Sequence, residues 1–272
     1  MKTKLITLCL VGAVLASCGT QPTLKVMSFN VRTSEKDDGP NNWENRRPAT
    51  KALLEEEKPD IFGVQEAQAV QLAYIASECP DYIPFGEGRD GGEEGEHAAI
   101  FYNRNVLELV DGGTWWLSET PDTVSRGWDA KYPRTATWGL MKDLRNGKQF
   151  YFVNTHLDHK GAQARKNGLK LIVEKTRGMN PEIPLILTGD FNVQPGDECL
   201  DALAGKLQDA RAVAKVTSEK ASSNSYGRSF KNIDYIFFAG FRGADKFDVL
   251  DKEYAGVPYI SDHYPIVATL VY

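Results

Sequence analysis

The stretch Pro184-Leu-Ile-Leu-Thr-Gly-Asp-Phe-Asn-Val-Gln-Pro195 governs how the rest of this chain is interpreted. Its apolar run, Leu185 to Leu187, predicts a short buried strand that ends in a carboxylate and an amide. Side chains alternate along a strand, so Asp190 and Asn192 should project from one side, where their oxygens can meet one phosphate or one hard cation. The alternative is an Asx turn that closes the strand, because Asp and Asn are common turn residues.

The same pattern recurs along the chain, where other predicted strands end in polar residues. The strand segments are Val26 to Asn30, Ile61 to Glu66, Phe150 to His156 and Ile233 to Phe238, and a polar cluster, Ser261-Asp262-His263, precedes the last strand. In this order, the six segments resemble the endonuclease/exonuclease/phosphatase superfamily. That group includes DNase I-like nucleases, abasic-site endonucleases, neutral sphingomyelinases and inositol-polyphosphate 5-phosphatases.

The resemblance covers residues 24–272 and implies a DNase I-like α/β fold. This fold is a four-layered α/β sandwich, with two mixed β-sheets packed face to face and helices on the outside. The sequence agrees, because predicted strands at 24–31 and 61–65 alternate with predicted helices at 43–57 and 67–77. No linker rich in Pro, Gly or Ser divides the chain, so we expect residues 24–272 to form one domain.

The N-terminus predicts an exported lipoprotein. Lys2 and Lys4 precede the apolar run Leu5 to Leu15, which is too short to span a membrane and is typical of a secretory signal. Leu15-Ala-Ser-Cys18 resembles a bacterial lipobox, which implies a signal peptide over 1–17, lipidation at Cys18 and a tether over 18–23. We therefore expect a lipid-anchored protein of the cell envelope, at the periplasmic or outer-membrane surface. Cleavage followed by release is the alternative.

The net charge does not favour a nucleic-acid substrate. It is −5, and removal of the signal takes two lysines and no acid, leaving −7. Nonspecific binding to nucleic acid depends on Lys and Arg, and the sequence has no basic stripe interleaved with aromatics. Bound cations supply positive charge locally, however, so nucleic acid stays a candidate. The pairing of Cys79 and Cys199 is left open.

The polar strand ends predict a site for a hard cation. They contain three carboxylates and two amides, Glu66, Asp190, Asp262, Asn30 and Asn192. Such oxygen donors suit Mg²⁺ or Mn²⁺, whereas zinc would require His and Cys at tetrahedral spacing. The resemblance implies that Glu66 is the principal metal ligand and that Asn30 and Asp262 assist it. It also implies that Asn192 orients the phosphate and that Asp190 positions or deprotonates the attacking water.

Two of the four histidines, His156 and His263, are the predicted catalytic pair. The resemblance implies that Asp234 holds His263 and that His156 binds the phosphate or protonates the leaving group. A carboxylate partner fixes the tautomer of an imidazole and raises its basicity, as a general base requires.

Two further residues are predicted to bind substrate. The resemblance places an arginine such as Arg134, at the entry of a strand, near the scissile phosphate, where a planar bidentate donor is suitable. A surface salt bridge is the alternative for Arg134. Asn154, in the segment that leads to His156, is the second predicted contact. No role is assigned to Arg89, His97, Asp158, His159 or Arg165.

These residues predict a monomeric, divalent-metal-dependent hydrolase of phosphate esters, either a phosphodiesterase or nuclease or a phosphatase. Nucleic acid, a phospholipid headgroup and a sugar phosphate all remain candidate substrates. The alternative is a noncatalytic binding module that keeps the fold.

Overall fold

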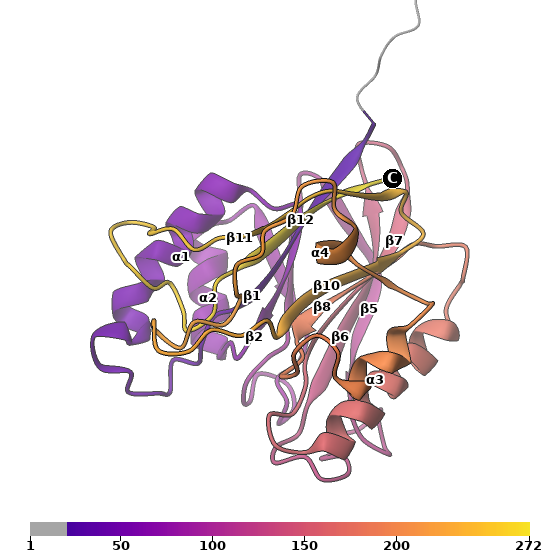
Figure 1. The fold of residues 1–272 in the computed structure, drawn as a ribbon, viewed down its shortest axis with the longest axis horizontal. Helices are drawn as coiled ribbons and strands as arrows, with labels where there is room; N and C mark the ends of the chain where they lie inside the picture. The colour runs from indigo at the N-terminus through magenta and orange to yellow at the C-terminus, as the bar shows by residue number, and fades with distance from the viewer. Residues whose placement is uncertain (1–20) are drawn as a thin grey trace, which may run out of the picture.

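The computed structural model describes residues 21–272, and in this range twelve strands form two sheets of six (Figure 1). The first sheet has the spatial order β11 (Gly243–Val249), β12 (Ile266–Val271), β1 (Thr23–Asn30), β2 (Ile61–Gln65), β4 (Ile100–Asn103) and β3 (Tyr82–Phe85). The second has the order β5 (Leu107–Trp116), β6 (Thr135–Asp143), β7 (Gln149–His156), β8 (Leu185–Asp190), β10 (Asp234–Ala239) and β9 (Gln208–Asp209).

Both sheets are mixed, as predicted. In the first sheet β1 pairs in parallel with β2 and antiparallel with β12. In the second, β7 pairs in parallel with β8 and antiparallel with β6. Parallel neighbours end at the same edge, so β1 and β2 bring Asn30 and Glu66 together, and β7 and β8 do the same for His156 and Asp190.

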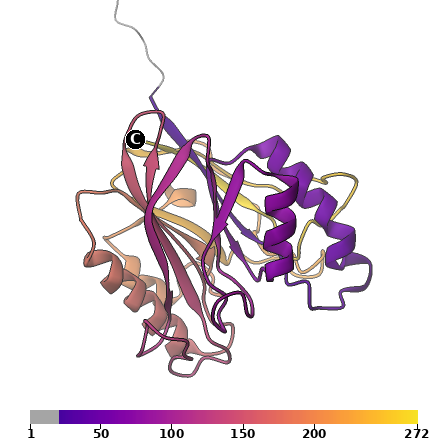
Figure 2. The ribbon, with the colours of Figure 1, turned by 180° about the vertical axis from the view of Figure 1, so that it is seen from behind.

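Helices cover the outer faces of the two sheets (Figure 2). The helices α1 (Trp43–Glu57) and α2 (Ala69–Glu78) pack on the first sheet, and α3 (Ala162–Arg177) packs on the second with the 3₁₀ helix η2 (Glu198–Leu203). Two short elements complete the order, the 3₁₀ helix η1 (Gly39–Asn41) and α4 (Ala210–Val213).

Three apolar clusters separate the four layers. Val26 and Phe152 belong to the cluster between the sheets, whereas Phe29 packs toward α1 and α2, and Val153 packs toward α3. The switch of face between neighbouring residues follows the period of two along a strand. The predicted four-layered α/β sandwich is therefore confirmed.

The open question about the cysteines is answered by this layering. Cys79 belongs to the cluster under α1 and α2, and Cys199 to the cluster under α3. Both thiols are free and buried on opposite sides of the molecule.

The chain enters the domain at the end of the sandwich opposite the polar strand ends. β1 begins at Thr23, one residue earlier than predicted, and Tyr272 N donates to Pro22 O beside it (Figure 1). The predicted signal peptide and Cys18 lie outside the described residues. Across 21–272, none of the helices combines the length and the hydropathy needed to cross a bilayer.

Candidate active site

A buried polar layer separates the apolar interior from the site. Asn154 is at its centre and is fully buried. Its amide nitrogen donates to Val64 O at 2.8 Å and Ala99 O at 2.9 Å in the other sheet. Its Oδ1 accepts from Gln65 Nε2 at 2.7 Å and Thr188 Oγ1 at 3.0 Å. The prediction that Asn154 contacts substrate is therefore wrong, because all its hydrogen-bonding capacity is used to join the two sheets.

Gly63 provides the space for this connection. A Cβ atom at this position would lie 2.2 Å from Asn154 Oδ1 and 2.7 Å from Thr188 Oγ1. The glycine in Ile61-Phe-Gly-Val-Gln65 is thus required for close approach of the side chain from the second sheet.

Directly above this layer, Asn30 joins two carboxylates. Its Nδ2 donates to Glu66 Oε1 and to Asp190 Oδ2, both at 3.0 Å. Its Oδ1 accepts from Arg32 N at 3.0 Å. Asn30 therefore holds Glu66 and Asp190 close to each other, although they come from different sheets.

His263 is paired with Asp234 as predicted. The distance between His263 Nδ1 and Asp234 Oδ2 is 2.8 Å, and His263 Nε2 lies 3.8 Å from Asp190 Oδ2. Burial opposes the charged imidazole, but the attraction of Asp234 and Asp190 is stronger and holds the pKa of His263 well above its usual value. A raised pKa favours the charged imidazole, which can donate a proton but not accept one, and this argues against the predicted role of His263 as the general base.

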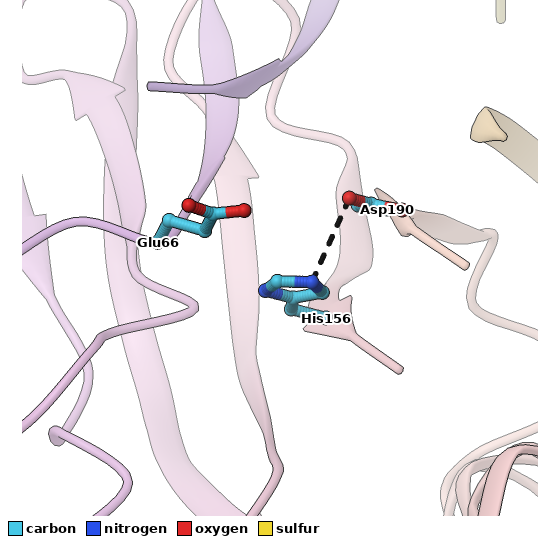
Figure 3. Close-up of side chains that lie close together, drawn as sticks. All are labelled: Glu66, His156 and Asp190. Atoms are coloured by element: carbon cyan, nitrogen blue, oxygen red, sulfur yellow. Dashed lines mark ion pairs between the residues drawn. The ribbon is translucent and has the colours of Figure 1, made fainter. Parts of the chain in front are cut away.

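His156 is in the opposite electrostatic state. Burial, together with the positive charge of Arg134, holds the pKa of His156 well below its usual value. The neutral ring accepts a hydrogen bond at Nε2 from Asn192 Nδ2 at 3.0 Å. Figure 3 shows the ring and the carboxylate of Asp190 directed toward each other, 3.6 Å apart, with Glu66 facing them.

Asp190 is the carboxylate that both histidines share. Burial raises its pKa to about 7, and repulsion by Asp234 adds to the effect. Its Oδ1 also accepts a hydrogen bond from Asn192 N at 2.9 Å. Asp190 therefore forms the Asx turn that was the alternative interpretation and also belongs to the polar site. Phe191 packs away from the site toward α3, as the alternation predicted.

The backbone turns sharply at three site residues. Arg32, Glu66 and Asn192 have φ values of 56°, 60° and 54°, in the left-handed region that non-glycine residues rarely adopt. Glu66 directly follows β2, and Arg32 and Asn192 lie two residues after the ends of β1 and β8, so this conformation redirects the three side chains into the cleft. Strain of this kind is commonly concentrated at functional sites.

Two arginines, Arg89 and Arg134, face the carboxylates across the cleft, and we call them the cationic wall. Arg134 donates through Nε to Asp158 Oδ2 at 3.3 Å, and its Nη2 lies 3.0 Å from His159 Nδ1. Arg89 donates through Nη1 to Glu96 Oε2 at 2.6 Å and lies over the ring of Tyr132. A cavity of about 470 Å³ separates the two sides and is lined by residues of both, among them Arg32, Glu66, Arg89, Arg134, His156, Asp190 and His263.

Asp158 holds the cationic wall in place. Burial penalises its charge, but backbone N–H groups of Gly161 and Lys160, the guanidinium of Arg134 and the N–H of Lys131 lower its pKa to about 2. Sequence reasoning gave Asp158 and His159 no role. The sequence feature that could have indicated a role for them is the carboxylate and the histidine that closely follow Asn154-Thr-His156.

Arg32 is the second group that sequence reasoning missed. Its Nη1 lies 3.6 Å from Asp262 Oδ2 and 3.9 Å from Glu66 Oε2. Asp262, predicted to bind metal, thus faces a guanidinium and stays an untested ligand. A basic residue two positions after Asn30 was the available signal.

Comparison with known proteins identifies the family. The model of the Endonuclease/Exonuclease/phosphatase family matches residues 27–263. The chain is similar to the solved mannosyl-6-phosphatase of Bacteroides thetaiotaomicron, with a TM-score of 0.87 and 36% identity over 92% of this chain and 100% of that one. An endonuclease/exonuclease/phosphatase from Bacteroides vulgatus gives a TM-score of 0.86 and 33% identity, covering 92% of this chain and 99% of that one.

Curated relatives are more distant. Human nocturnin is 25% identical over 91% of this chain, and the match spans 65% of nocturnin. The match to the Drosophila melanogaster protein angel spans 58% of that protein. Family and structural neighbours together support the hydrolysis of phosphate esters. From the extent of the family match and the identity to these solved structures, the chain belongs to the Endonuclease/Exonuclease/phosphatase family.

Proposed function

We propose that this protein is a divalent-metal-dependent phosphatase that removes phosphate from phosphorylated sugars. The observation that carries the proposal is the cleft, which has paired carboxylates and histidines on one side and arginines on the other. A phosphate monoester carries close to two negative charges near neutral pH, so it benefits from several positive donors in one place.

The arginines of the cationic wall have N–H groups that are free to donate hydrogen bonds to such a dianion. Nε of Arg89 is buried without a hydrogen-bond partner in the described part of the chain. Across residues 21–272, Nη1 of Arg134 likewise has no hydrogen-bond partner, while Asp158 and His159 hold the rest of the guanidinium. A guanidinium held in this way can donate a hydrogen bond to a phosphate oxygen with little loss of side-chain freedom.

The opposite side fits a hard cation. Glu66, His156 and Asp190 each place one ligand atom within 4.8 Å of the others, and Asn30 fixes the two carboxylates. Oxygen donors of this kind suit Mg²⁺ or Mn²⁺, with Glu66 as the principal ligand. When bound, the ion would polarise the phosphate and offset its charge.

The carboxylates and histidines of the site also divide the proton chemistry. Asp190, with a pKa of about 7, is suited to accept a proton from the attacking water. Charged His263, held by Asp234, is suited to stabilise a phosphate oxygen, and Asn192 orients the neutral ring of His156. We therefore assign general-base catalysis to Asp190 instead of His263.

Three observations support a sugar phosphate over nucleic acid. The cleft has a volume of about 470 Å³, the chain has a net charge of −5, and the mannosyl-6-phosphatase is 36% identical to this chain. A channel for a nucleic-acid backbone would need a longer basic track.

A substrate panel tests the proposal. We expect Mg²⁺-dependent release of phosphate from mannose 6-phosphate, lost with a chelator and restored by added Mg²⁺. The value of kcat/KM should exceed that for bis(p-nitrophenyl) phosphate, sphingomyelin, RNA and DNA. Faster cleavage of a diester would refute the monoesterase assignment, and no turnover of any substrate would favour a noncatalytic binding module.

We further propose that the protein is exported and anchored through Cys18. The support is the signal-like N-terminus and the sequence separation between Cys18 and Thr23, where β1 begins, which is only four intervening residues. Strand β1 spans eight residues from Thr23 to Asn30, which is about 23 Å of extended chain. An anchor at this end would hold the cleft away from the membrane, open to soluble substrate.

A further inference from the structure

The two carboxylate oxygens of Glu66 face different surroundings. Oε1 accepts from Asn30 Nδ2, which also donates to Asp190, so this oxygen belongs to the catalytic cluster. Oε2 accepts from Thr33 N at 3.2 Å and lies 3.9 Å from Arg32 Nη1. Among the described residues, the guanidinium of Arg32 is the positive group within 4 Å of Glu66, and it lies on the Oε2 side.

The guanidinium of Arg32 lies between two carboxylates that would otherwise suit a cation. Its Nη1 is 3.6 Å from Asp262 Oδ2 as well as 3.9 Å from Glu66 Oε2. Both acids are largely buried, and burial together with repulsion by Glu66 raises the pKa of Asp262. A positive charge at this position offsets the repulsion between them.

Arg32 is held in this position from several directions. Its Nε and Nη2 donate to the two oxygens of Asp38 at 2.8 and 3.0 Å, a bidentate pair that fixes the plane of the guanidinium. Its backbone N–H donates to Asn30, and its carbonyl accepts from Gln71 Nε2 at 3.0 Å and Arg46 Nη2 at 3.3 Å. The side chain is therefore positioned by the fold in advance of any ligand.

We propose that the guanidinium of Arg32 takes the place of a second divalent cation between Glu66 and Asp262. The site then holds one divalent ion, on the Oε1 side of Glu66, and Asp262 acts as a counter-ion of Arg32. A guanidinium provides charge that does not depend on metal concentration, because it stays protonated at all working pH values. This inference rests on the metal dependence proposed above.

Titration of the full chain with Mn²⁺ alone, followed by calorimetry and by the EPR signal of free Mn²⁺, tests the proposal. We expect one ion per wild-type chain. Arg32→Met removes the charge but keeps an aliphatic stem, and it should bind a second ion or bind the first about tenfold more tightly. Arg32→Lys keeps a positive charge and should stay at one ion.

Matched variants separate the site from general charge effects. Arg47→Met removes an exposed arginine that pairs with Glu44, and it should leave Mn²⁺ binding unchanged. Asp262→Asn should change the affinity for the ion by less than about threefold, whereas Glu66→Gln should weaken it by about tenfold or more. If Arg32→Met does not fold, as judged by its melting transition, Arg32→Gln replaces it.

Each outcome decides between the two proposals. Two ions of similar affinity in the wild type, or unchanged binding in folded Arg32→Met, would overturn the assignment of Arg32 while leaving a metal-dependent phosphatase intact. A wild type that binds no Mn²⁺ would overturn both.

Discussion

Replacing Asp158 with Asn should lower stability and loosen the cationic wall together. Asp158 accepts four hydrogen bonds: Oδ1 from the backbone N–H groups of Lys160 and Gly161, Oδ2 from the N–H of Lys131 and from Arg134 Nε. An asparagine can keep the first two, but its NH₂ group would then face two donors. Arg134 would lose the carboxylate that holds it.

The magnitude follows from the pKa of this group. The folded pKa of Asp158 is about 2, below the value of about 3.9 for an unperturbed aspartate, so its charge contributes about 2 to 3 kcal/mol to the free energy of unfolding at neutral pH. Because the folded pKa is the lower one, this contribution is complete above the unfolded pKa and is lost as pH falls toward 2.

Urea unfolding of the wild type and Asp158→Asn across pH measures this contribution. We expect the variant to be less stable by about 2 to 3 kcal/mol at pH 7, and the difference to shrink between about pH 4 and pH 2. In the activity assay, KM should rise more than kcat falls if Arg134 binds the substrate phosphate, as the proposed function requires. A stability difference that stays constant down to pH 2 would refute the reasoning.

Three further predictions concern the layer below the site, the metal and the anchor. Gly63→Ala should cost about 2 to 4 kcal/mol in chemical denaturation because its Cβ would displace Asn154, whereas Gly243→Ala, with no atom within 4 Å of the added Cβ, should cost little. Glu66→Gln should abolish Mg²⁺-dependent phosphate release and leave the melting temperature unchanged or raised, since it removes one of several clustered acids; normal turnover would show that the metal lies elsewhere. Intact mass spectrometry of protein from its native host should show an acyl adduct at Cys18, and an unmodified chain that begins elsewhere would exclude the anchor.

Most of the site was predictable because its residues follow recognisable strands. Asp190, His156 and Asn30 each end an apolar or alternating run, and parallel neighbours carry their polar ends to a common edge. The pairing of Asp234 with His263 also followed, since both lie where the last strands meet the site. Helix α1 has the predicted bounds, Trp43–Glu57.

The features that sequence analysis misjudged or missed depend on contacts between residues far apart in the sequence, or on local irregularities of a strand. Asn154 and His156 share a face of β7, but Asn154 lies one step deeper, and only the absence of a side chain at Gly63 lets it reach the other sheet. The ion pair of Arg32 with Asp262 joins opposite ends of the chain. The sequence of strand β11 gives no clear period of two, because a bulge between Ala244 and Lys246 breaks its alternation.

The role of His263 also could not be predicted from sequence alone. A histidine beside an aspartate is a plausible general base, and the sequence supports that role. The structure adds Asp190 at 3.8 Å, and this second carboxylate contributes to the raised pKa of the ring. Only the three-dimensional arrangement shows that two acids act on one imidazole.

The most direct test of the account is a double-mutant cycle on Asp234 and His263, measured as phosphate release at saturating Mg²⁺. If the two side chains act as one unit beside Asp190, Asp234→Asn and His263→Ala should each lower kcat/KM by about 10² to 10⁴, and the double variant should be no slower than the slower single variant. A double variant whose loss equals the product of the two single losses would contradict the account, because it would show that the pair works as two independent groups.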